Sequence, residues 1–237
     1  MGIIFITGTG TGVGKTYFTG LLARACQEAG INVITQKPVQ TGCRKQIADD
    51  ILLHRKLQGI KCTIYDKKKI TCPYIFSYPA SPHLAAARAK TSIQIGTIIK
   101  QSAILEKNFS LVLIEGAGGL LVPLTENFTI LDYIARCGFP VVLVTQTLLG
   151  SINQTLLSIE ALQQKKIKIM ALAVNLYFKE KPAITGDFPG IIRAFHPEIP
   201  IIFFKNKISG INVRQSGILS NLNLSGNSIV IKDEKKI

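Results

Sequence analysis

Short hydrophobic runs rich in β-branched residues alternate along the chain with longer stretches whose apolar residues recur at helical spacing. Apolar runs of this kind are typical of strands buried on both faces of a parallel sheet. The pattern predicts strands at residues 3–7, 32–36, 110–115, 140–145, 169–175 and 199–204. It predicts helices at residues 15–29, 49–57, 92–107, 130–137, 151–164 and 189–195. This order favours a doubly wound α/β fold, a mostly parallel sheet with helices on both faces, whose ligands bind beyond the carboxyl ends of the strands.

The composition is that of a chain able to bury a large core. It has 237 residues, of which 47% are hydrophobic and 18% charged, and we expect a single P-loop-type α/β domain over residues 1–237 with a short basic tail at about 226–237. No apolar run approaches the ~20 residues that span a bilayer, and the start reads as a strand rather than a signal peptide. The five cysteines are scattered without a C-x-x-C pair, as in reduced proteins. We expect a cytoplasmic protein with no membrane partner.

The net charge of +14 raises the question of nucleic acid. The lysines fall in short clusters, such as residues 67–69 and 165–168, and no aromatic residues interleave with them as stacking platforms. This distribution favours a solvated lysine-rich surface that also attracts anionic nucleotides. We expect no nucleic-acid partner.

A glycine-rich segment follows the first predicted strand. Residues 7–16 read TGTGTGVGKT and lead directly into a predicted helix. Backbone N–H groups in such a loop bind phosphate, Lys15 neutralises its charge, and the hydroxyl of Thr16 is placed to bind Mg²⁺. The standard spacing requires a glycine where this chain has Thr9, and the nearest upstream glycine is Gly8, so the loop is one residue longer. The segment predicts a nucleotide phosphate site.

Charged residues lie at the carboxyl ends of two other predicted strands, directly after one strand and as the last residue of the other. Lys37 follows the second strand and precedes Pro38, which stiffens the turn, although a lysine in this position is by itself more typical of a surface. Glu115 ends a wholly apolar strand and is followed by residues 116–119, Gly-Ala-Gly-Gly. This resembles a Walker B element, in which the acid binds Mg²⁺ directly or through water. The structural alternative is a glutamate satisfied within a glycine turn.

Two predicted helices begin with residues open to two interpretations. Asp49 and Asp50 either complement the helix dipole or provide a second carboxylate for the metal, and the residues alone favour neither. Ser151 suits a helix N-cap, and Asn153 in the first turn would present its amide outward. Capping alone would explain the serine.

Five segments, in this order, resemble the dethiobiotin synthetases, the ATP-dependent carboxylases of biotin biosynthesis. They are residues 7–16, 37–42 (KPVQTG), 79–83 (PASPH), 115–119 (EGAGG) and 149–153 (LGSIN), and the resemblance covers roughly residues 1–180. It implies a homodimer that converts 7,8-diaminononanoate (7,8-diaminopelargonate), CO₂ and ATP to dethiobiotin, ADP and phosphate. One amine forms a carbamate, the carbamate attacks the γ-phosphate, and the second amine displaces phosphate from the mixed anhydride to close the ring.

The resemblance also implies roles for individual residues. Catalytic roles fall to Lys37, Lys15 and Thr11, and the Mg²⁺ ligands would be Thr16, Asp49 and Glu115. Nucleotide binding is implied for Gly12, Val13, Gly14, Lys15, Thr16, Tyr17, Asp49, Glu115, Gly116, Ala117, Gly118 and Asn175. Substrate binding is implied for Thr41 and for Gly150, Ser151, Ile152 and Asn153, the last four holding the carboxylate tail from the facing subunit.

The chain departs from the family's pattern at several positions. Gly10 stands where the family usually has aspartate, and residues 201–206 lack the usual glycine and proline of the base loop, which leaves Asn175 as the candidate for reading the base. We choose Asp49 over Asp50 because the apolar spacing after it fits better. The alternative function is a ParA/MinD-like regulatory ATPase, but those proteins carry a lysine at the position of Gly10. A cobyrinate amide synthase would need a glutaminase domain.

Overall fold

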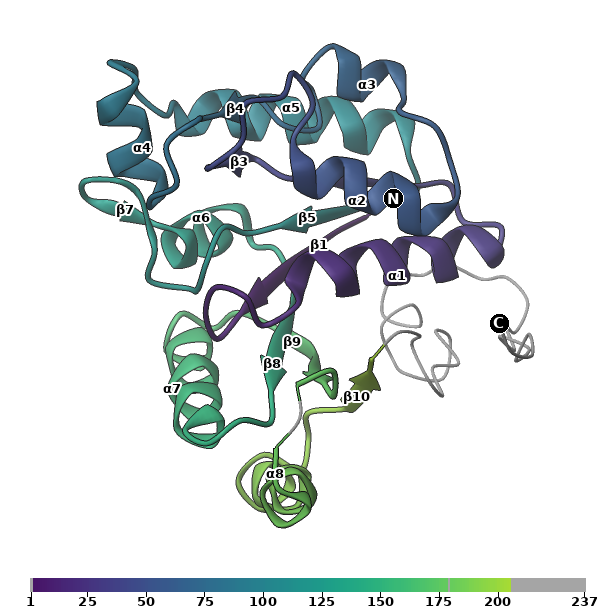
Figure 1. Cartoon of the computed structure of the whole chain (residues 1–237), viewed down its shortest axis with the longest axis vertical. Coiled ribbons are helices and arrows are strands. Elements are labelled where there is room, and N and C mark those ends of the chain that lie inside the picture. Colours follow the sequence, from purple (N-terminus) through teal and green to yellow (C-terminus); the bar gives the residue numbers. More distant parts are fainter. Residues whose placement is uncertain (1, 179, 206–237) are drawn as a thin grey trace.

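The computed structural model describes residues 2–178 and 180–205. Its centre is a 6-stranded sheet in the order β10-β9-β8-β1-β5-β2, in which each neighbouring pair is parallel (Figure 1). The strands are β1 (Gly2–Gly8), β2 (Val33–Gln36), β5 (Leu111–Glu115), β8 (Val141–Gln146), β9 (Ile169–Asn175) and β10 (Ile201–Phe204). The predicted strands are confirmed, because continuous apolar runs are the signature of strands buried on both faces.

The main helices follow these strands in the chain. They are α1 (Lys15–Glu28), α2 (Asp49–Gln58), α5 (Ile95–Asn108), α6 (Ile130–Cys137), α7 (Ser151–Gln164) and α8 (Pro182–Phe195). The predicted start of the last helix at residue 189 is wrong. Pro182 occupies the first turn, where a missing N–H costs nothing, and Pro189 lies inside the helix. Because proline is typical of the first turn of a helix, the sequence pattern indicated a start at Pro189.

The two faces of the sheet bury different helices. Ile4 and Ile6 of β1 pack with Phe18 and Leu22 of α1, whereas Phe5 points to the opposite face. That opposite face is covered by apolar residues of α5, α6, α7 and α8. Side chains alternate across a strand, so this division follows from the sequence period of two. Helices therefore lie on both faces, as predicted.

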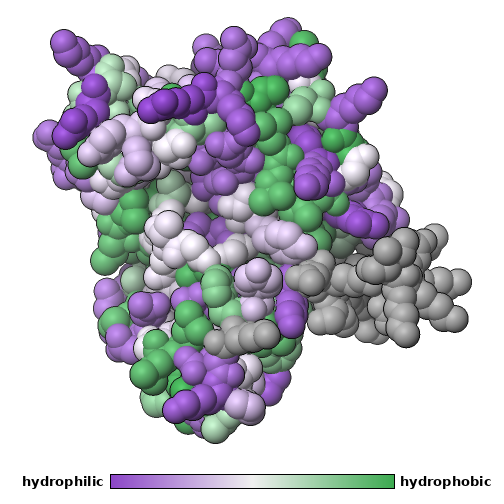
Figure 2. Space-filling view, in the orientation of Figure 1, coloured by the Kyte–Doolittle hydropathy of each residue, from purple (hydrophilic) through white to green (hydrophobic). Residues whose placement is uncertain are grey.

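Several short elements lack enough periodicity to be predicted. They are α3 (Ile64–Lys67), α4 (Pro82–Arg88), the parallel pair β3 (Val39–Gln40) and β4 (Tyr74–Ile75), and the antiparallel pair β6 (Pro123–Thr125) and β7 (Phe128–Thr129). In Figure 2 hydrophilic side chains gather at the top of the view, over α3 and its neighbours. Within the described ranges no helix is long and apolar enough to cross a membrane. The predicted basic tail at 226–237 lies outside the described residues.

Candidate active site

The glycine-rich loop lies at the middle of the sheet, between the carboxyl end of β1 and the start of α1. Gly12 and Gly14 have φ angles of +78° and +103°, which favour glycine. A Cβ at position 14 would also come within 2.4 Å of the Asn175 Nδ2 atom. The additional residue of the loop extends the sheet pairing. The N–H of Thr9 donates to the Val144 carbonyl at 3.0 Å and so continues the pairing of β1 with β8.

Lys15 folds back over this loop. Its Nζ donates to the Gly10 carbonyl at 2.6 Å, and the side chain is buried. Burial, together with the nearby charge of Lys37, lowers the pKa of Lys15 to about 8. The negative charge of a bound polyphosphate would favour the protonated form, so anion binding is expected to raise the pKa of Lys15 again.

Strand register explains how Lys37 and Glu115 meet beside the loop. Ile6 of β1 pairs with Glu115 of β5, and Gln36 at the end of β2 pairs with Ile114. The next residue, Lys37, therefore reaches the end of β5. Its Nζ lies 2.9 Å from Glu115 Oε1 and 3.1 Å from the carbonyl oxygen of Gly116.

The charges at this point are strongly coupled and buried. Burial alone would lower the pKa of Lys37, but the charges of Glu115 and Asp50 outweigh it and hold that pKa above its ordinary value. Burial would raise the pKa of Glu115, but Lys37 and a hydrogen bond from His54 hold it well below its ordinary value. Thr16 completes the group, since its Oγ1 donates to Glu115 Oε1 at 2.9 Å. Lys37 is thus a fixed cation and Glu115 a fixed anion.

The second acid of this cluster is Asp50. Its Oδ2 lies 2.8 Å from Lys37 Nζ, whereas Asp49 pairs with Lys45 at 2.7 Å and its side chain is 45% exposed. The structure therefore brings Asp50, and not the expected Asp49, to this cluster, because apolar spacing fixes a helix face only to within a residue at the first turn. α2 begins at Asp49, and its second residue points toward the loop.

A cavity of about 710 Å³ opens in front of these groups. Thr11 and Thr41 line it, together with Lys15, Lys37 and Asp50. Gly12, Gly14, Thr16, Tyr17, Glu115, Ala117 and Gly118 also contribute to its wall. The opposite side is formed by residues 79–82, part of the PASPH segment. The sequence alone assigns no role to that segment or to Gln40, which also lines the cavity.

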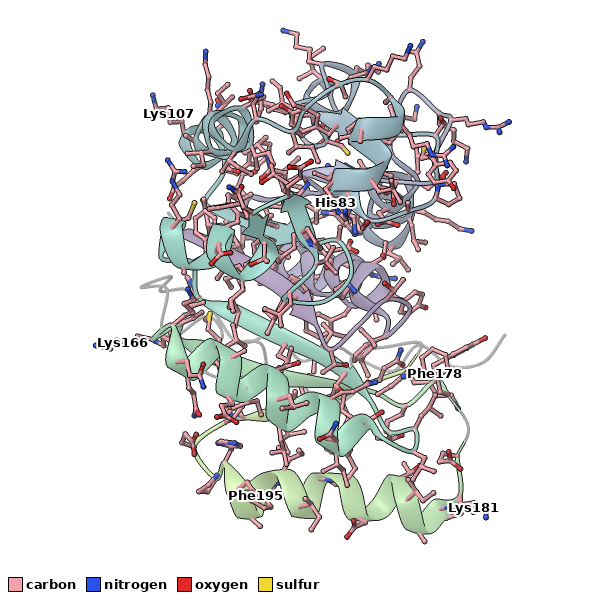
Figure 3. All side chains as sticks on the ribbon, turned by 90° about the vertical axis from the view of Figure 1, so that its left-hand side faces the viewer. His83, Lys107, Lys166, Phe178, Lys181 and Phe195 are labelled. Atoms are coloured by element: carbon pink, nitrogen blue, oxygen red, sulfur yellow. The ribbon has the colours of Figure 1, made fainter. Side chains whose placement is uncertain are left out.

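Asn175 lies at a separate cavity of about 340 Å³ behind the loop. Its Nδ2 donates to the Val13 carbonyl at 3.0 Å, and its Oδ1 accepts from the Tyr177 N–H at 2.9 Å. The cavity is also lined by Gly12, Gly14, Tyr17, Phe178 and Lys205. Phe178 lies past the end of β9 at the edge of the molecule (Figure 3). An amide with one donor and one acceptor already fixed presents a defined edge to a planar ligand.

The four residues expected to hold the substrate tail do not line the 710 Å³ cavity. Gly150 has a φ angle of +89° and precedes α7, Ser151 is buried, and Asn153 is exposed. They neighbour a third cavity of about 480 Å³, formed by residues 9–11, 119–123 and one face of α7. Within one chain, the structure does not bring the tail segment together with Lys15 and Lys37.

Comparison with known proteins identifies the family. A family model described as an AAA domain matches residues 3–202. The ATP-dependent dethiobiotin synthetase of Haemophilus influenzae is 51% identical over 175 residues, which cover 74% of this chain and 91% of that protein. The chain belongs to the ATP-dependent dethiobiotin synthetase family. The Pasteurella multocida member is 47% identical over 193 residues, 81% of this chain and 90% of that one.

Solved structures establish the fold class independently. A chain of the MinC:MinD cell division protein complex from Aquifex aeolicus has a TM-score of 0.51 at 18% identity, covering 92% of this chain and 86% of that one. The pNOB8 ParA bound to nonspecific DNA also has a TM-score of 0.51, at 13% identity, covering 83% and 76%. These likenesses confirm the predicted P-loop NTPase-like fold. Family membership rests on the sequence relatives, so the chain is an ATP-dependent enzyme of biotin synthesis.

Replacing Asp50 is expected to change the metal requirement, and replacing Asp49 is not. Asp50→Asn removes one of the two carboxylates that meet at Lys37, and hard divalent cations prefer anionic oxygen ligands. The Mg²⁺ concentration for half-maximal activity should therefore rise in Asp50→Asn. Asp49→Asn, one residue away and paired with an exposed lysine, is the matched control. Equal effects of the two variants would show that the geometry around Lys37 does not select the metal ligand.

Proposed function

We propose that the protein closes the ureido ring of dethiobiotin, using 7,8-diaminononanoate, CO₂ and ATP and releasing ADP and phosphate. The observation that carries this proposal is the convergence of Lys15, Lys37, Glu115 and Asp50 on one cavity beside a phosphate-binding loop. Two cations and two carboxylates in front of a nucleotide site suit a reaction in which one anion, a carbamate, attacks another, a triphosphate.

The triphosphate would lie on the loop between β1 and α1. N–H groups at the start of α1 and the ammonium group of Lys15 bind its outer phosphates. The hydroxyl of Thr16 and the carboxylates of Glu115 and Asp50 are oxygen donors of the kind that Mg²⁺ takes, with water and phosphate completing the shell. Bound there, Mg²⁺ would neutralise charge on the phosphates. Asn175 and the cavity lined by Tyr17 and Phe178 would receive the base.

The diamine would enter from the side of Thr11 and Thr41. One amine adds to CO₂, loses a proton and becomes a carbamate. A carbamate oxygen then attacks the γ-phosphorus, and the bond to ADP breaks. The second amine attacks the carbonyl carbon of the mixed anhydride, phosphate leaves with the bridging oxygen, and the amine proton is lost. Lys37, held protonated by its two carboxylates, stabilises the carbamate and the transferring phosphoryl group as a fixed charge and not as a base.

We further propose that the protein acts as a homodimer whose partner supplies residues 150–153. Three leucines near this segment, Leu121, Leu149 and Leu157, are 68%, 84% and 59% exposed. Leu121, Leu157 and Thr11 line the same 480 Å³ cavity, which joins the loop to α7. Apolar side chains gathered around a groove favour an interface. The partner's α7 start would then hold the substrate carboxylate with backbone N–H groups.

The reaction is tested by ADP release from the purified protein with ATP and Mg²⁺. Release should need both 7,8-diaminononanoate and bicarbonate, and omission of either should return it to the level of ATP alone. A rate of ADP release that does not depend on the diamine and increases with DNA or lipid vesicles would favour the alternative, a ParA/MinD-like regulatory ATPase.

The shared site predicts complementation between Asn153→Ala and Lys15→Ala, assayed at a diamine concentration far below the KM of the Asn153→Ala variant. Asn153→Ala should raise the KM for the diamine and leave the KM for ATP nearly unchanged. In a 1:1 mixture with Lys15→Ala, a heterodimer contains one intact site, so about a quarter of the wild-type activity should return when subunits exchange freely across a two-fold interface. Asp187→Ala, on α8 away from both cavities, is the control partner for Lys15→Ala, because this mixture should keep half of the wild-type activity and so shows that Lys15→Ala subunits do not inactivate the subunits they join. A mixture that stays inactive although heterodimers form would contradict the shared site.

A further inference from the structure

Behind Glu115 lies a second layer of buried polar side chains that the proposed chemistry does not use. His54 of α2 is fully buried, and its Nε2 lies 2.9 Å from Glu115 Oε2. Its Nδ1 lies 3.0 Å from Thr35 Oγ1 on β2. The two carboxylate oxygens of Glu115 therefore face different partners. Oε2 meets the imidazole, and Oε1 meets Thr16 and Lys37.

The Glu115 carboxylate and the neighbouring Arg55 together set the direction of these hydrogen bonds. Arg55 NH1 donates to Thr35 Oγ1 at 2.8 Å, and a guanidinium group cannot accept. The ionised Glu115 carboxylate can only accept, so the imidazole proton lies on Nε2 and is donated to Glu115 Oε2. Nδ1 of the neutral ring is then an acceptor, and the hydroxyl of Thr35, which accepts from Arg55, donates its own proton to it. The donors run in one direction, from Arg55 through Thr35 and His54 to Glu115.

Arg55 is itself rigidly held. It forms a two-pronged ion pair with Asp66, Nε to Oδ2 at 2.9 Å and NH2 to Oδ1 at 2.8 Å. NH1 also donates to Gln58 Oε1 at 2.9 Å, and NH2 reaches the Thr35 carbonyl at 3.4 Å. All the N–H donors of the fork are engaged, and the side chain is 2% exposed. A buried, fully satisfied fork has little freedom to reorient.

We propose that His54, oriented by Thr35 and Arg55, is a positioning residue that fixes the Glu115 carboxylate so that its Oε1 faces Thr16 and the bound metal–nucleotide. This inference rests on the proposed function of Glu115 and names the groups that hold it in place. Without the imidazole donor, the carboxylate would rotate about its last torsion, which is soft for glutamate. Outer partners of this kind orient metal-binding carboxylates, and their loss typically costs 10- to 100-fold in metal affinity or activity.

The test measures Mg²⁺ binding to the protein–ADP complex by calorimetry, which needs no diamine and no turnover. His54→Leu removes the donor, and Thr35→Val removes the hydroxyl that orients it while keeping the side-chain shape. We expect the Kd for Mg²⁺ to rise by about 10-fold in both variants. The Kd for ADP measured in EDTA should stay within about twofold of wild type, since the phosphate loop is untouched. Thr35→Ser restores the hydroxyl and should return the Kd for Mg²⁺ most of the way.

Ser102→Ala is the matched control for loss of a buried hydrogen bond. Ser102 Oγ donates at 2.7 Å to Oε1 of Gln36, the residue that follows Thr35 on β2. The serine donates no hydrogen bond to Glu115. A folded Thr35→Val or His54→Leu variant with unchanged Mg²⁺ affinity would overturn the proposal. An equal rise in the Ser102→Ala control would do so too, because the effect would then come from general loosening of β2. Failure of the wild type to make dethiobiotin would instead refute the proposed reaction and leave this binding measurement intact.

Discussion

The Lys15→Ala variant is expected to lose turnover by about 100-fold or more, equivalent to a barrier higher by about 3 kcal/mol. Lys15 Nζ is the cation nearest the loop carbonyl of Gly10 and lines the nucleotide cavity. Its charge acts on phosphate oxygens whose charge changes during transfer, so its loss raises the barrier and not only the KM. Steady-state ADP release in the presence of diamine and bicarbonate measures the effect.

Lys45→Ala provides the control for Lys15→Ala. Lys45 is a lysine that lies shortly before α2 in the chain, but its side chain is 63% exposed and pairs with Asp49. Its removal should leave turnover close to wild type, as for most exposed ion pairs. Near-native turnover of Lys15→Ala itself would mean that the loop does not bind the transferring phosphates.

The Lys37→Gln variant is expected to bind ATP nearly as well as wild type while turnover falls sharply. Lys37 is placed to stabilise the carbamate and the transferring phosphoryl group, charges that develop after nucleotide has bound. ATP affinity and turnover should therefore separate in this variant. Comparison of the Kd for ATP with kcat checks the separation. Loss of ATP binding alone, with kcat intact, would place Lys37 in the phosphate cradle.

The same variant should also change how stability depends on pH. Lys37 is the main source of the low pKa of Glu115, so its loss raises that pKa in the folded state. In the wild type this depressed pKa stabilises the fold above the unfolded pKa of glutamate, about 4.3, and the stabilisation is lost as pH falls. The deficit of Lys37→Gln in free energy of unfolding should therefore be largest near pH 7 and shrink as the pH falls below about 4.3, toward the low folded pKa of Glu115. Urea unfolding at several pH values measures it, and a deficit that is constant with pH would show that the two charges are not coupled.

Much of the fold and of the central site could be predicted from the sequence because the signals are local. Continuous apolar runs marked the six sheet strands, and the glycine-rich loop followed by Lys15 and Thr16 marked the proposed phosphate site. Glu115 was predicted as a site residue because it is a charged residue at the end of a wholly apolar strand, directly before a glycine turn. Each of these features is formed by residues adjacent in the chain and can therefore be recognised from the sequence alone.

What the sequence left open depends on contacts between distant segments. The difference between Asp49 and Asp50 is decided by Lys37, which reaches the second residue of α2 from another strand. The role of His54 is equally invisible in the chain, because its partners Thr35 and Glu115 come from β2 and β5. Pro189 misled the helix assignment, since a proline inside a helix is tolerated only when the surrounding packing supports it. Register and packing supply this information, and one-residue shifts change which side chain points inward.

The central claim is that a carbamate oxygen attacks the γ-phosphate, and an isotope measurement tests it most directly. The enzyme is mixed with ATP, Mg²⁺, 7,8-diaminononanoate and freshly dissolved C¹⁸O₂ in unlabelled water, and the phosphate is analysed by mass spectrometry before the label exchanges with solvent. The bridging oxygen leaves with phosphate, so the account predicts one ¹⁸O atom in each phosphate and one in the ureido carbonyl of dethiobiotin. Phosphate that carries no ¹⁸O while ADP accumulates would show that water or another group attacks ATP, and would contradict the account.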